Sequence, residues 1–188
     1  MGRLNVSLSN DTIKRIQEIS KREGKTISSI VSESISLYDD ISKYGRNRKD
    51  IEKIFKILSL MKTFEAIPVP SILLDFSISK CMSTSSDETI SFWKETGKQL
   101  GVIIKEIAPD IDDVKNMVQD YGPLLPLNGL EVIHKNDLVT IIITGTGYTK
   151  DSSLATAYAV EGFLESYGYK EFNIQVMEGF VKVDGKKY

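Results

Sequence analysis

Apolar and polar side chains alternate at the start of the chain. The apolar residues are Leu4, Val6 and Leu8, and the polar residues between them are Arg3, Asn5 and Ser7. A period of two predicts a strand over residues 3–8 that buries one face and presents the other. Such a strand is not stable alone at a chain terminus, because its unpaired edge needs a partner. The simplest partner is the same strand of a second copy, which gives an antiparallel two-stranded ribbon.

The apolar spacing changes from two to helical directly after this strand. Good N-cap residues stand at positions 9–11, and isoleucines then recur at positions 13, 16 and 19. Gly24 is placed to end this first helix. Thr26 can cap a second helix, which has an apolar side and ends between positions 38 and 44. The first 44 residues are therefore expected to form a strand, a helix, a turn and a helix.

The outward face of the predicted strand carries a guanidinium, an amide and a hydroxyl group. These groups can hydrogen-bond to base edges, and a two-stranded ribbon is narrow enough for the major groove of DNA. The pattern resembles the ribbon-helix-helix family of DNA-binding proteins, the group of the Arc and MetJ repressors. The resemblance rests on the strand Arg-Leu-Asn-Val-Ser-Leu, the turn Gly24-Lys25-Thr26 and the run Ile27–Ile35.

The resemblance implies an intertwined homodimer with two kinds of DNA contact. The strand residues Arg3, Asn5 and Ser7 would read bases. The start of the second helix would hold a phosphate through its backbone N–H groups, as helix N-termini do in general. The residues of that phosphate site are Lys25, Thr26, Ser28 and Ser29. An alternative interpretation is that the segment only helps a larger domain to dimerise.

A polar stretch separates this segment from the rest of the chain. Gly45–Asp50 contains no apolar residue, which predicts a linker that is either a solvated hinge or a further contact to the DNA backbone. A third helix is expected from Asp50 onward, and Pro68 and Pro70 end it. We therefore expect a DNA-binding domain over residues 1–44, a linker and connecting helix over 45–66, and a regulatory or oligomerisation domain over 67–188.

The last domain mixes helical and strand patterns. Helical spacing covers 89–107, 111–121 and 154–167, whereas strands are predicted at 130–133, 138–144, 172–176 and 180–183. The continuous apolar run Leu138–Thr144 predicts a strand that is buried on both faces. A loop of small residues is expected at 83–86. The order predicts an α+β domain in which helices pack on an antiparallel sheet, separate from the N-terminal ribbon-helix-helix.

Two features of this domain are candidates for ligand contact. The loop with Gly145, Thr146 and Gly147 leads from a predicted strand into a helix N-terminus, which suits an anion. An ordinary loop is the alternative, because Gly-x-Gly alone is a weak motif. Glycines at positions 97 and 101 leave one side of a helix without bulk. They favour close helix packing, and the alternative is a pocket for a flat ligand beside Trp93.

The end of the chain is also similar to the ligand-binding domain of the 4-vinyl reductase type. The similarity rests on Glu95–Gly101, on Val160–Gly168 and on two strands that end near Asp184 and Gly185. That family often carries cysteines in its last strands, and this chain has none there. The resemblance therefore concerns the fold, and it implies no metal site.

The charge distribution and the reactive side chains limit the classes of function that the sequence allows. The net charge is −2, but residues 1–53 hold 11 Lys and Arg against 8 Asp and Glu, so the basic part coincides with the predicted DNA-binding part. The chain has one histidine, His134, and one cysteine, Cys81. This inventory offers no recognisable Ser-His-Asp set and no cluster of metal ligands, and His134 is expected in a turn. We therefore expect no enzyme activity, no catalytic residue, no metal and no cofactor.

Together these features predict a sequence-specific transcriptional regulator in the cytoplasm. Its expected partners are double-stranded DNA and a second copy of itself, with a tetramer and a small-molecule effector as open alternatives. No apolar run reaches the length of a membrane span, so no membrane partner is expected. Two other functions stay open: an antitoxin that regulates its own toxin–antitoxin pair, and an architectural or segregation protein that coats DNA.

Overall fold

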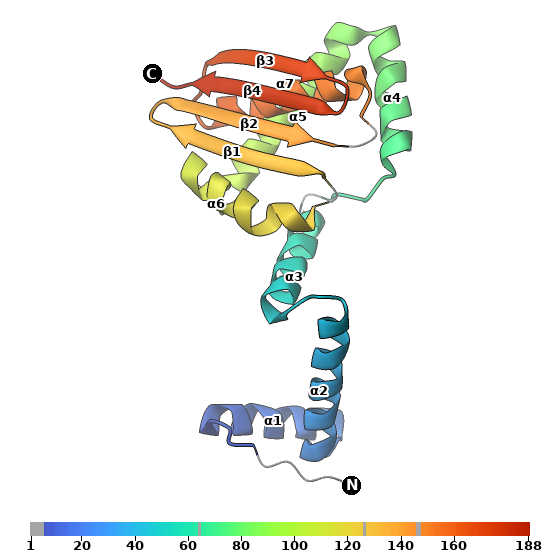
Figure 1. Cartoon of the computed structure of the whole chain (residues 1–188), viewed down its shortest axis with the longest axis vertical. Coiled ribbons are helices and arrows are strands. Elements are labelled where there is room, and N and C mark those ends of the chain that lie inside the picture. Colours follow the sequence, from blue (N-terminus) through green and yellow to red (C-terminus); the bar gives the residue numbers. More distant parts are fainter. Residues whose placement is uncertain (1–5, 64, 126, 146–147) are drawn as a thin grey trace. The chain divides into compact units, whose positions relative to one another are not determined.

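The computed structural model describes residues 6–63, 65–125, 127–145 and 148–188. The chain divides into two units, Met1–Leu60 and Met61–Tyr188. The described residues form seven α-helices and one four-stranded antiparallel sheet, which confirms the predicted α+β class (Figure 1). No helix in the described part of the chain is long and apolar enough to cross a membrane.

The first unit begins with two helices whose ends follow the local sequence. Helix α1 spans Asn10–Glu23, and its N-cap Ser9 accepts a hydrogen bond from the N–H of Thr12 at 3.2 Å. Gly24 ends it with a φ of 66°, which glycine adopts without strain. Helix α2 spans Ile27–Lys43, and the hydroxyl of Thr26 accepts from the N–H of Ser29 at 3.1 Å. The predicted stop at Gly24 and the predicted cap at Thr26 are confirmed.

Helix α3 spans Arg48–Thr63 and crosses the boundary between the units.

The predicted strand over residues 3–8 is not formed in the described part of the single chain. Arg3 and Asn5 lie outside the described residues, and residues 6–9 belong to no helix or strand. A two-stranded ribbon needs the same segment of a second copy, because an isolated strand leaves its backbone N–H and C=O groups without partners. A single chain supplies no such partner.

The second unit is built on a sheet with the strand order β1-β2-β4-β3, in which all neighbours are antiparallel. The strands are β1 (Gly129–Lys135), β2 (Leu138–Thr144), β3 (Glu171–Met177) and β4 (Phe180–Lys186). The register places Ile141 of β2 between Val132 of β1 and Val183 of β4. All three side chains are buried, so they belong to the covered face of the sheet.

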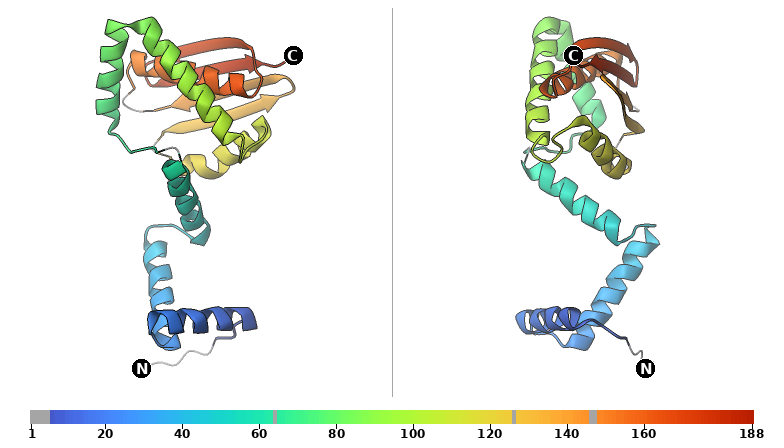
Figure 2. Two further views of the ribbon diagram at one scale, coloured as in Figure 1. Left: turned by 180° about the vertical axis from the view of Figure 1, so that it is seen from behind. Right: turned by 90° about the vertical axis from the view of Figure 1, so that its left-hand side faces the viewer.

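Helices cover this face in two layers. The helices of the unit are α4 (Ser71–Thr84), α5 (Ser86–Ile104), α6 (Ile111–Tyr121) and α7 (Lys150–Ser166), with a short 3-10 turn at Gly122–Leu124. Helix α7 packs on β3 and β4, α6 packs on β1, and α5 packs on α7 (Figure 2). The core joins residues of these helices, such as Val114 and Leu164, to the inward-facing residues of the sheet.

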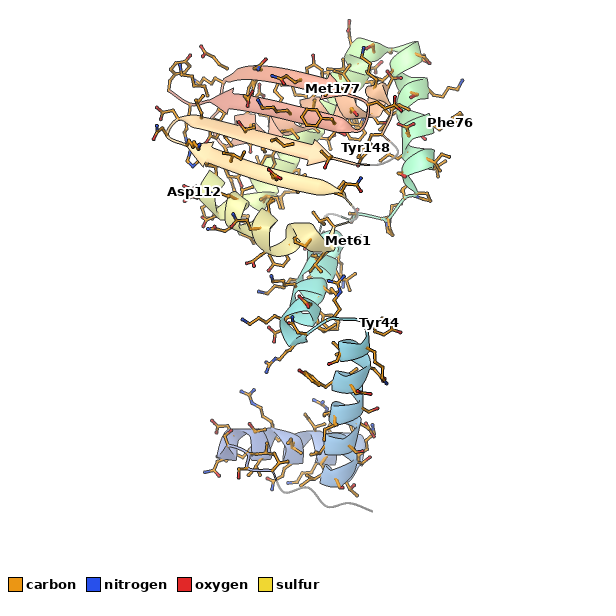
Figure 3. The ribbon with its side chains drawn as sticks, in the orientation of Figure 1. Tyr44, Met61, Phe76, Asp112, Tyr148 and Met177 are labelled. Carbon is orange, nitrogen blue, oxygen red and sulfur yellow. The ribbon has the colours of Figure 1, made fainter. Side chains whose placement is uncertain are left out.

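The prediction that Leu138–Thr144 is buried on both faces is wrong. Val139 and Ile141 are buried under the helices, whereas Ile142 is half-buried and Leu138 is 54% exposed. Met177 of β3 is also exposed (Figure 3). The neighbouring strands β1 and β4 shield part of β2, but no described helix packs on the second face. A uniformly apolar run does not indicate whether one or two layers will cover its strand, because it lacks the alternation that marks a solvent face.

The contact between α5 and α7 depends on two glycines. A Cβ atom at Gly97 of α5 would collide with the backbone carbonyl of Ala159, and a Cβ atom at Gly162 of α7 would collide with the backbone of Lys94. The two helices therefore touch backbone to backbone. The Nζ atom of Lys94 lies 2.6 Å from Oε1 of Glu161 beside this contact. The interpretation of the helix glycines as close packing is confirmed.

Replacing Gly97 with Ala should destabilise the second unit by about 2–3 kcal/mol, because the added methyl group forces two backbones apart. This loss should exceed the gain in helix propensity, which is about 1 kcal/mol. Urea unfolding of the full chain, followed by the fluorescence of Trp93, the single tryptophan, measures the change. Ser91→Ala at an exposed position of the same helix is the control and should change stability by less than about 0.5 kcal/mol. Equal stability of Gly97→Ala and the unmodified protein would contradict the packing described here.

Candidate nucleic-acid interface

The first unit has almost no interior of its own. Among its described residues only Ile30 is buried, with 8% of its surface exposed. Many apolar side chains of α1, α2 and the segment before them are exposed; they are Val6, Leu8, Ile13, Ile27, Ile35, Leu37 and Tyr38. Burial of one side chain does not offset the conformational entropy lost when two helices become ordered. These apolar faces are therefore suited to contact with another protein surface.

The predicted phosphate residues lie together at the start of α2. Helix geometry leaves the N–H groups of Ile27 and Ser28 without a partner inside the helix, whereas the N–H of Ser29 donates to Thr26. Ser28 is exposed, and Ser29 is half-buried. Lys25 directly precedes the cap, so one ammonium group and two available N–H groups lie at one helix end. This arrangement has the donors that an anion needs.

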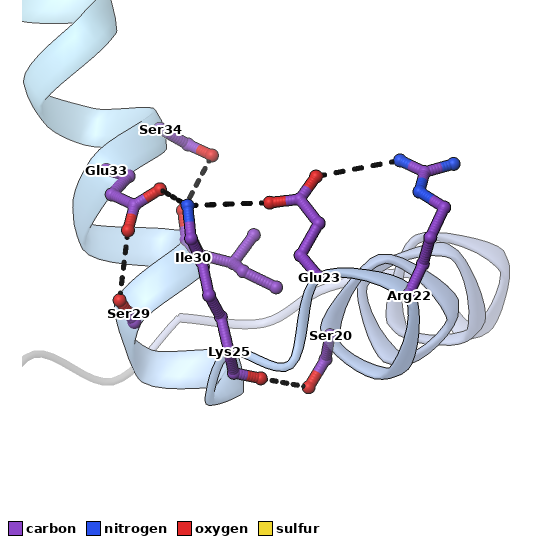
Figure 4. A network of polar contacts seen from close by, with 8 residues as sticks. All are labelled: Ser20, Arg22, Glu23, Lys25, Ser29, Ile30, Glu33 and Ser34. Atoms are coloured by element: carbon purple, nitrogen blue, oxygen red, sulfur yellow. Dashed lines mark hydrogen bonds and ion pairs between the residues drawn. The ribbon is translucent and has the colours of Figure 1, made fainter.

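Lys25 is engaged by two carboxylates (Figure 4). Its Nζ atom lies 2.7 Å from Oε2 of Glu33 and 3.5 Å from Oε2 of Glu23. The hydrogen bond to Glu33 and the negative charge of Glu33 raise the pKa of Lys25. The same hydrogen bond, together with one from the Ser29 hydroxyl at 3.1 Å, lowers the pKa of Glu33. Exposed ion pairs of this kind stabilise little, so a DNA phosphate has to displace only weak contacts to reach Lys25.

The predicted base-reading residues are described only in part. Ser7 is exposed, between the exposed side chains of Val6 and Leu8. Arg3 and Asn5 lie outside the described residues. Base reading by Arg3, Asn5 and Ser7 therefore stays a prediction from the sequence.

In the second unit, the predicted ligand loop is attached to the turn between β3 and β4. The N–H of Gly145 donates to the carbonyl of Gly179 at 3.1 Å, and the N–H of Gly179 donates to the carbonyl of Tyr148 at 3.0 Å. Thr146 and Gly147 lie outside the described residues. The N–H of Gly145 and the carbonyl of Tyr148 are therefore engaged by the protein itself.

The helix N-terminus that follows this loop also has an internal partner. Oδ1 of Asp75, on α4, accepts hydrogen bonds from the N–H of Thr149 at 3.0 Å, from its hydroxyl at 2.8 Å and from the hydroxyl of Ser152. Burial raises the pKa of Asp75, but these hydrogen bonds outweigh burial and hold the pKa below its ordinary value. The Asp75 carboxylate places a negative charge at the N-terminus of α7, where the helix dipole favours one, and its hydrogen bonds attach α4 to α7. No pattern near position 75 indicates this role, because its partners lie more than 70 residues away.

Trp93 and His134, the other two residues singled out from the sequence, lie elsewhere in the second unit. Trp93 lines a cavity between α4 and α5, and the described residues of the loop do not line it. The expectation that His134 lies in a turn is wrong, because β1 includes it and its Nδ1 atom lies 3.0 Å from Oδ1 of Asp112. In the described ranges no group of three or more His, Cys, Asp and Glu residues is arranged to hold a metal ion.

Asp75 should contribute to stability at neutral pH and lose this contribution in acid. Its pKa is lowered in the folded state, so its stabilisation is present above the ordinary value of 3.8 and is lost as the pH falls through the folded value. Asp75→Asn should therefore lower the free energy of unfolding by about 1–2 kcal/mol at pH 7, and the difference from the unmodified protein should shrink below pH 4. Urea unfolding across this pH range measures it. Asp137→Asn, at an exposed position, is the control for the loss of one charge. A difference between Asp75→Asn and the unmodified protein that grows in acid would contradict the assignment.

Comparison with known proteins does not add a family to this description. Neither protein-family models nor curated proteins give a match to the chain. The similarity to the ribbon-helix-helix family and the similarity to the 4-vinyl reductase type therefore stay predictions from the sequence. What bears on function is the chemistry of the two units: an N-terminal helix pair with exposed apolar faces and a group of anion donors, and a C-terminal unit with its own core.

Proposed function

We propose that the chain is a homodimeric, sequence-specific DNA-binding transcriptional regulator of the ribbon-helix-helix type. One observation carries the proposal: α1 and α2 bury only Ile30, although their apolar residues recur at helical spacing. In a ribbon-helix-helix dimer, these faces of two copies cover each other. The two N-terminal segments then pair as an antiparallel ribbon, which supplies the missing partner for each strand edge.

The ribbon would contact bases, and the start of α2 would contact phosphates. Arg3, Asn5 and Ser7 would face the major groove, where an arginine and an asparagine can each form two hydrogen bonds to one base. The N–H groups at the start of α2 and the ammonium group of Lys25 would bind a phosphate in each half of the site. Phosphate contacts set register and affinity, whereas the ribbon residues set sequence preference.

The second unit would regulate this binding or join dimers into a larger assembly. It has a core of its own, separate from the helices that would contact DNA. Such a unit can couple a second signal or a second contact to the DNA-binding state. A short antitoxin segment that is disordered when free does not have a core of this kind, so a regulator is favoured over an antitoxin.

Selection of genomic DNA fragments by the purified full-length protein tests the proposal. The unmodified protein should recover a short palindromic site, because a two-fold symmetric dimer binds two half-sites. Arg3→Ala and Asn5→Ala should each weaken binding to this site by about 1–3 kcal/mol and relax the sequence preference. The double variant should recover fragments without selectivity.

A matched double variant, Arg15→Ala with Gln17→Ala, controls for the loss of one guanidinium and one amide from an exposed part of the same unit. It should keep the selected site. Unselective recovery by the unmodified protein would favour an architectural DNA-binding protein. Recovery that is the same for the Arg3→Ala, Asn5→Ala variant would show that the ribbon does not read bases.

Lys25→Ala should weaken binding to all DNA sequences by a similar factor, because a phosphate contact carries no sequence information. The slope of log K against log salt concentration should become shallower by about 2 for a dimer, since each lost phosphate contact contributes about 0.9. Equilibrium binding at several salt concentrations measures this slope. Lys43→Ala is a matched control, because Lys43 is also exposed and paired with carboxylates but lies at the other end of α2. An unchanged slope for Lys25→Ala would remove Lys25 from the phosphate site.

A further inference from the structure

A cavity of about 520 Å³ lies between α4 and α5 in the second unit, and it is open to solvent along exposed side chains such as Glu88 and Phe92. One wall includes Ile78 and Cys81 of α4, and the other includes Glu88, Phe92 and Trp93 of α5. Its volume falls within the range of small-molecule sites, which is roughly 300–1,000 Å³. Apolar and aromatic side chains with a few polar groups are also typical of such sites.

Separate contacts hold the two walls apart. Helix α4 is attached to the start of α7 through Asp75, and α5 is attached to the middle of α7 through the backbone contact at Gly97. The single residue Ser85 joins the two helices, and they diverge from this point (Figure 2). These contacts fix the backbones of the two walls at separate points of α7, so the cavity is present without a ligand.

Most polar side chains of the cavity present acceptors to it, and the Ser85 hydroxyl and the Cys81 thiol are the lining groups that keep a proton to donate. Three hydroxyls of the lining, those of Ser77, Thr84 and Thr89, donate their proton to the carbonyl four residues earlier in the chain, at 2.7–2.9 Å. Toward the cavity they therefore offer lone pairs. Glu88 is the one charged residue of the lining, and its side chain forms no hydrogen bond or ion pair among the described residues. A ligand that satisfies these groups carries donors or a positive charge.

We propose that this cavity binds a lipophilic organic cation, an ammonium or phosphonium-like charge on an apolar or aromatic body. The charge lies near the Glu88 carboxylate, and the apolar body packs against Ile78 and Phe92. The indole of Trp93 adds a cation–π attraction, for which tryptophan is the best aromatic partner. Organic anions are disfavoured, because Glu88 and the hydroxyl lone pairs repel them. In the regulator proposed above this cation is the effector; that role rests on the proposed function, whereas the binding does not.

The chain carries two probes of this cavity. Trp93 is its only tryptophan and Cys81 its only cysteine, and both line the cavity. The full-length protein is titrated with tetraphenylphosphonium and with tetraphenylborate, which has nearly the same shape and the opposite charge. We expect a saturable change of Trp93 fluorescence and slower alkylation of Cys81 with the phosphonium ion. The borate should bind at least about tenfold more weakly, which corresponds to a difference of about 1.4 kcal/mol.

Glu88→Gln separates charge recognition from apolar contact. It should weaken phosphonium binding by about tenfold and strengthen borate binding, because the charge is removed while the shape stays. Glu95→Gln is the matched control, since Glu95 is exposed on the same helix and lies outside the lining. It should leave both affinities unchanged.

Three results would overturn the inference. The first is no saturable signal with the phosphonium ion. The second is equal binding of both ions, with no effect of Glu88→Gln, which would mean unselective apolar contact. The third is slower alkylation of Cys81 at higher protein concentration without any ion, which would mean that a second copy covers the cavity.

The Arg3→Ala, Asn5→Ala variant separates this inference from the proposed function. It should bind the phosphonium ion with unchanged affinity, because its changes lie in the other unit. Phosphonium binding by a protein that selects no DNA site would support the cavity and contradict the regulator. A selected DNA site without phosphonium binding would support the regulator and contradict the cavity inference.

Discussion

Helix α7 connects the other parts of the second unit, and its contact with α5 leaves no space for a side chain at Gly97 or Gly162. The helix can pack between two layers because small residues, among them Ala155 and Ala157, occupy its buried positions. One side of α7 covers β3 and β4, and another side meets α5. The sheet, the outer helix and the core between them therefore depend on one close approach of two backbones.

The start of the same helix positions α4. The carboxylate of Asp75 accepts hydrogen bonds from Thr149 and Ser152 at the positive end of the helix dipole, so α4 is attached at a site distinct from the α5 contact. With both helices attached to α7, the space between them persists as a cavity beside Trp93. The packing that stabilises the unit thus also creates the cavity that we propose as a ligand site.

The first unit follows a different principle. Its helices have well-defined ends at Ser9, Gly24 and Thr26, but only Ile30 is buried among its described residues. Local capping stabilises a helix by about 1 kcal/mol per cap, which does not order two helices without tertiary contacts. A dimer would join folding and DNA binding in one step, because the same association would bury the apolar faces and pair the two ribbon strands.

Local chemistry explains which features of this protein the sequence by itself determined. Capping side chains and glycine at positive φ defined the ends of α1 and the start of α2. Alternation of apolar residues located β3, and a continuous apolar run located β2. These effects act between residues a few positions apart, so they are visible in a pattern. The predicted loop at 83–86 is reduced to Ser85 between two helices, because helical spacing at the end of α4 and the start of α5 continues up to that residue.

Tertiary structure decided the features that join distant residues. Asp75 reaches Thr149, which is 74 positions away, and no local pattern indicates that pairing. The single covered face of β2 depends on where α6 and α7 pack, and a uniformly apolar run contains no information about that. Glu88 of α5 lines the same cavity as Cys81 of α4 only because both helices are attached to α7 at separate points. The physical reason is the same in each case: caps and alternation are properties of neighbouring residues, whereas cavities, buried faces and attachment points are properties of packed surfaces.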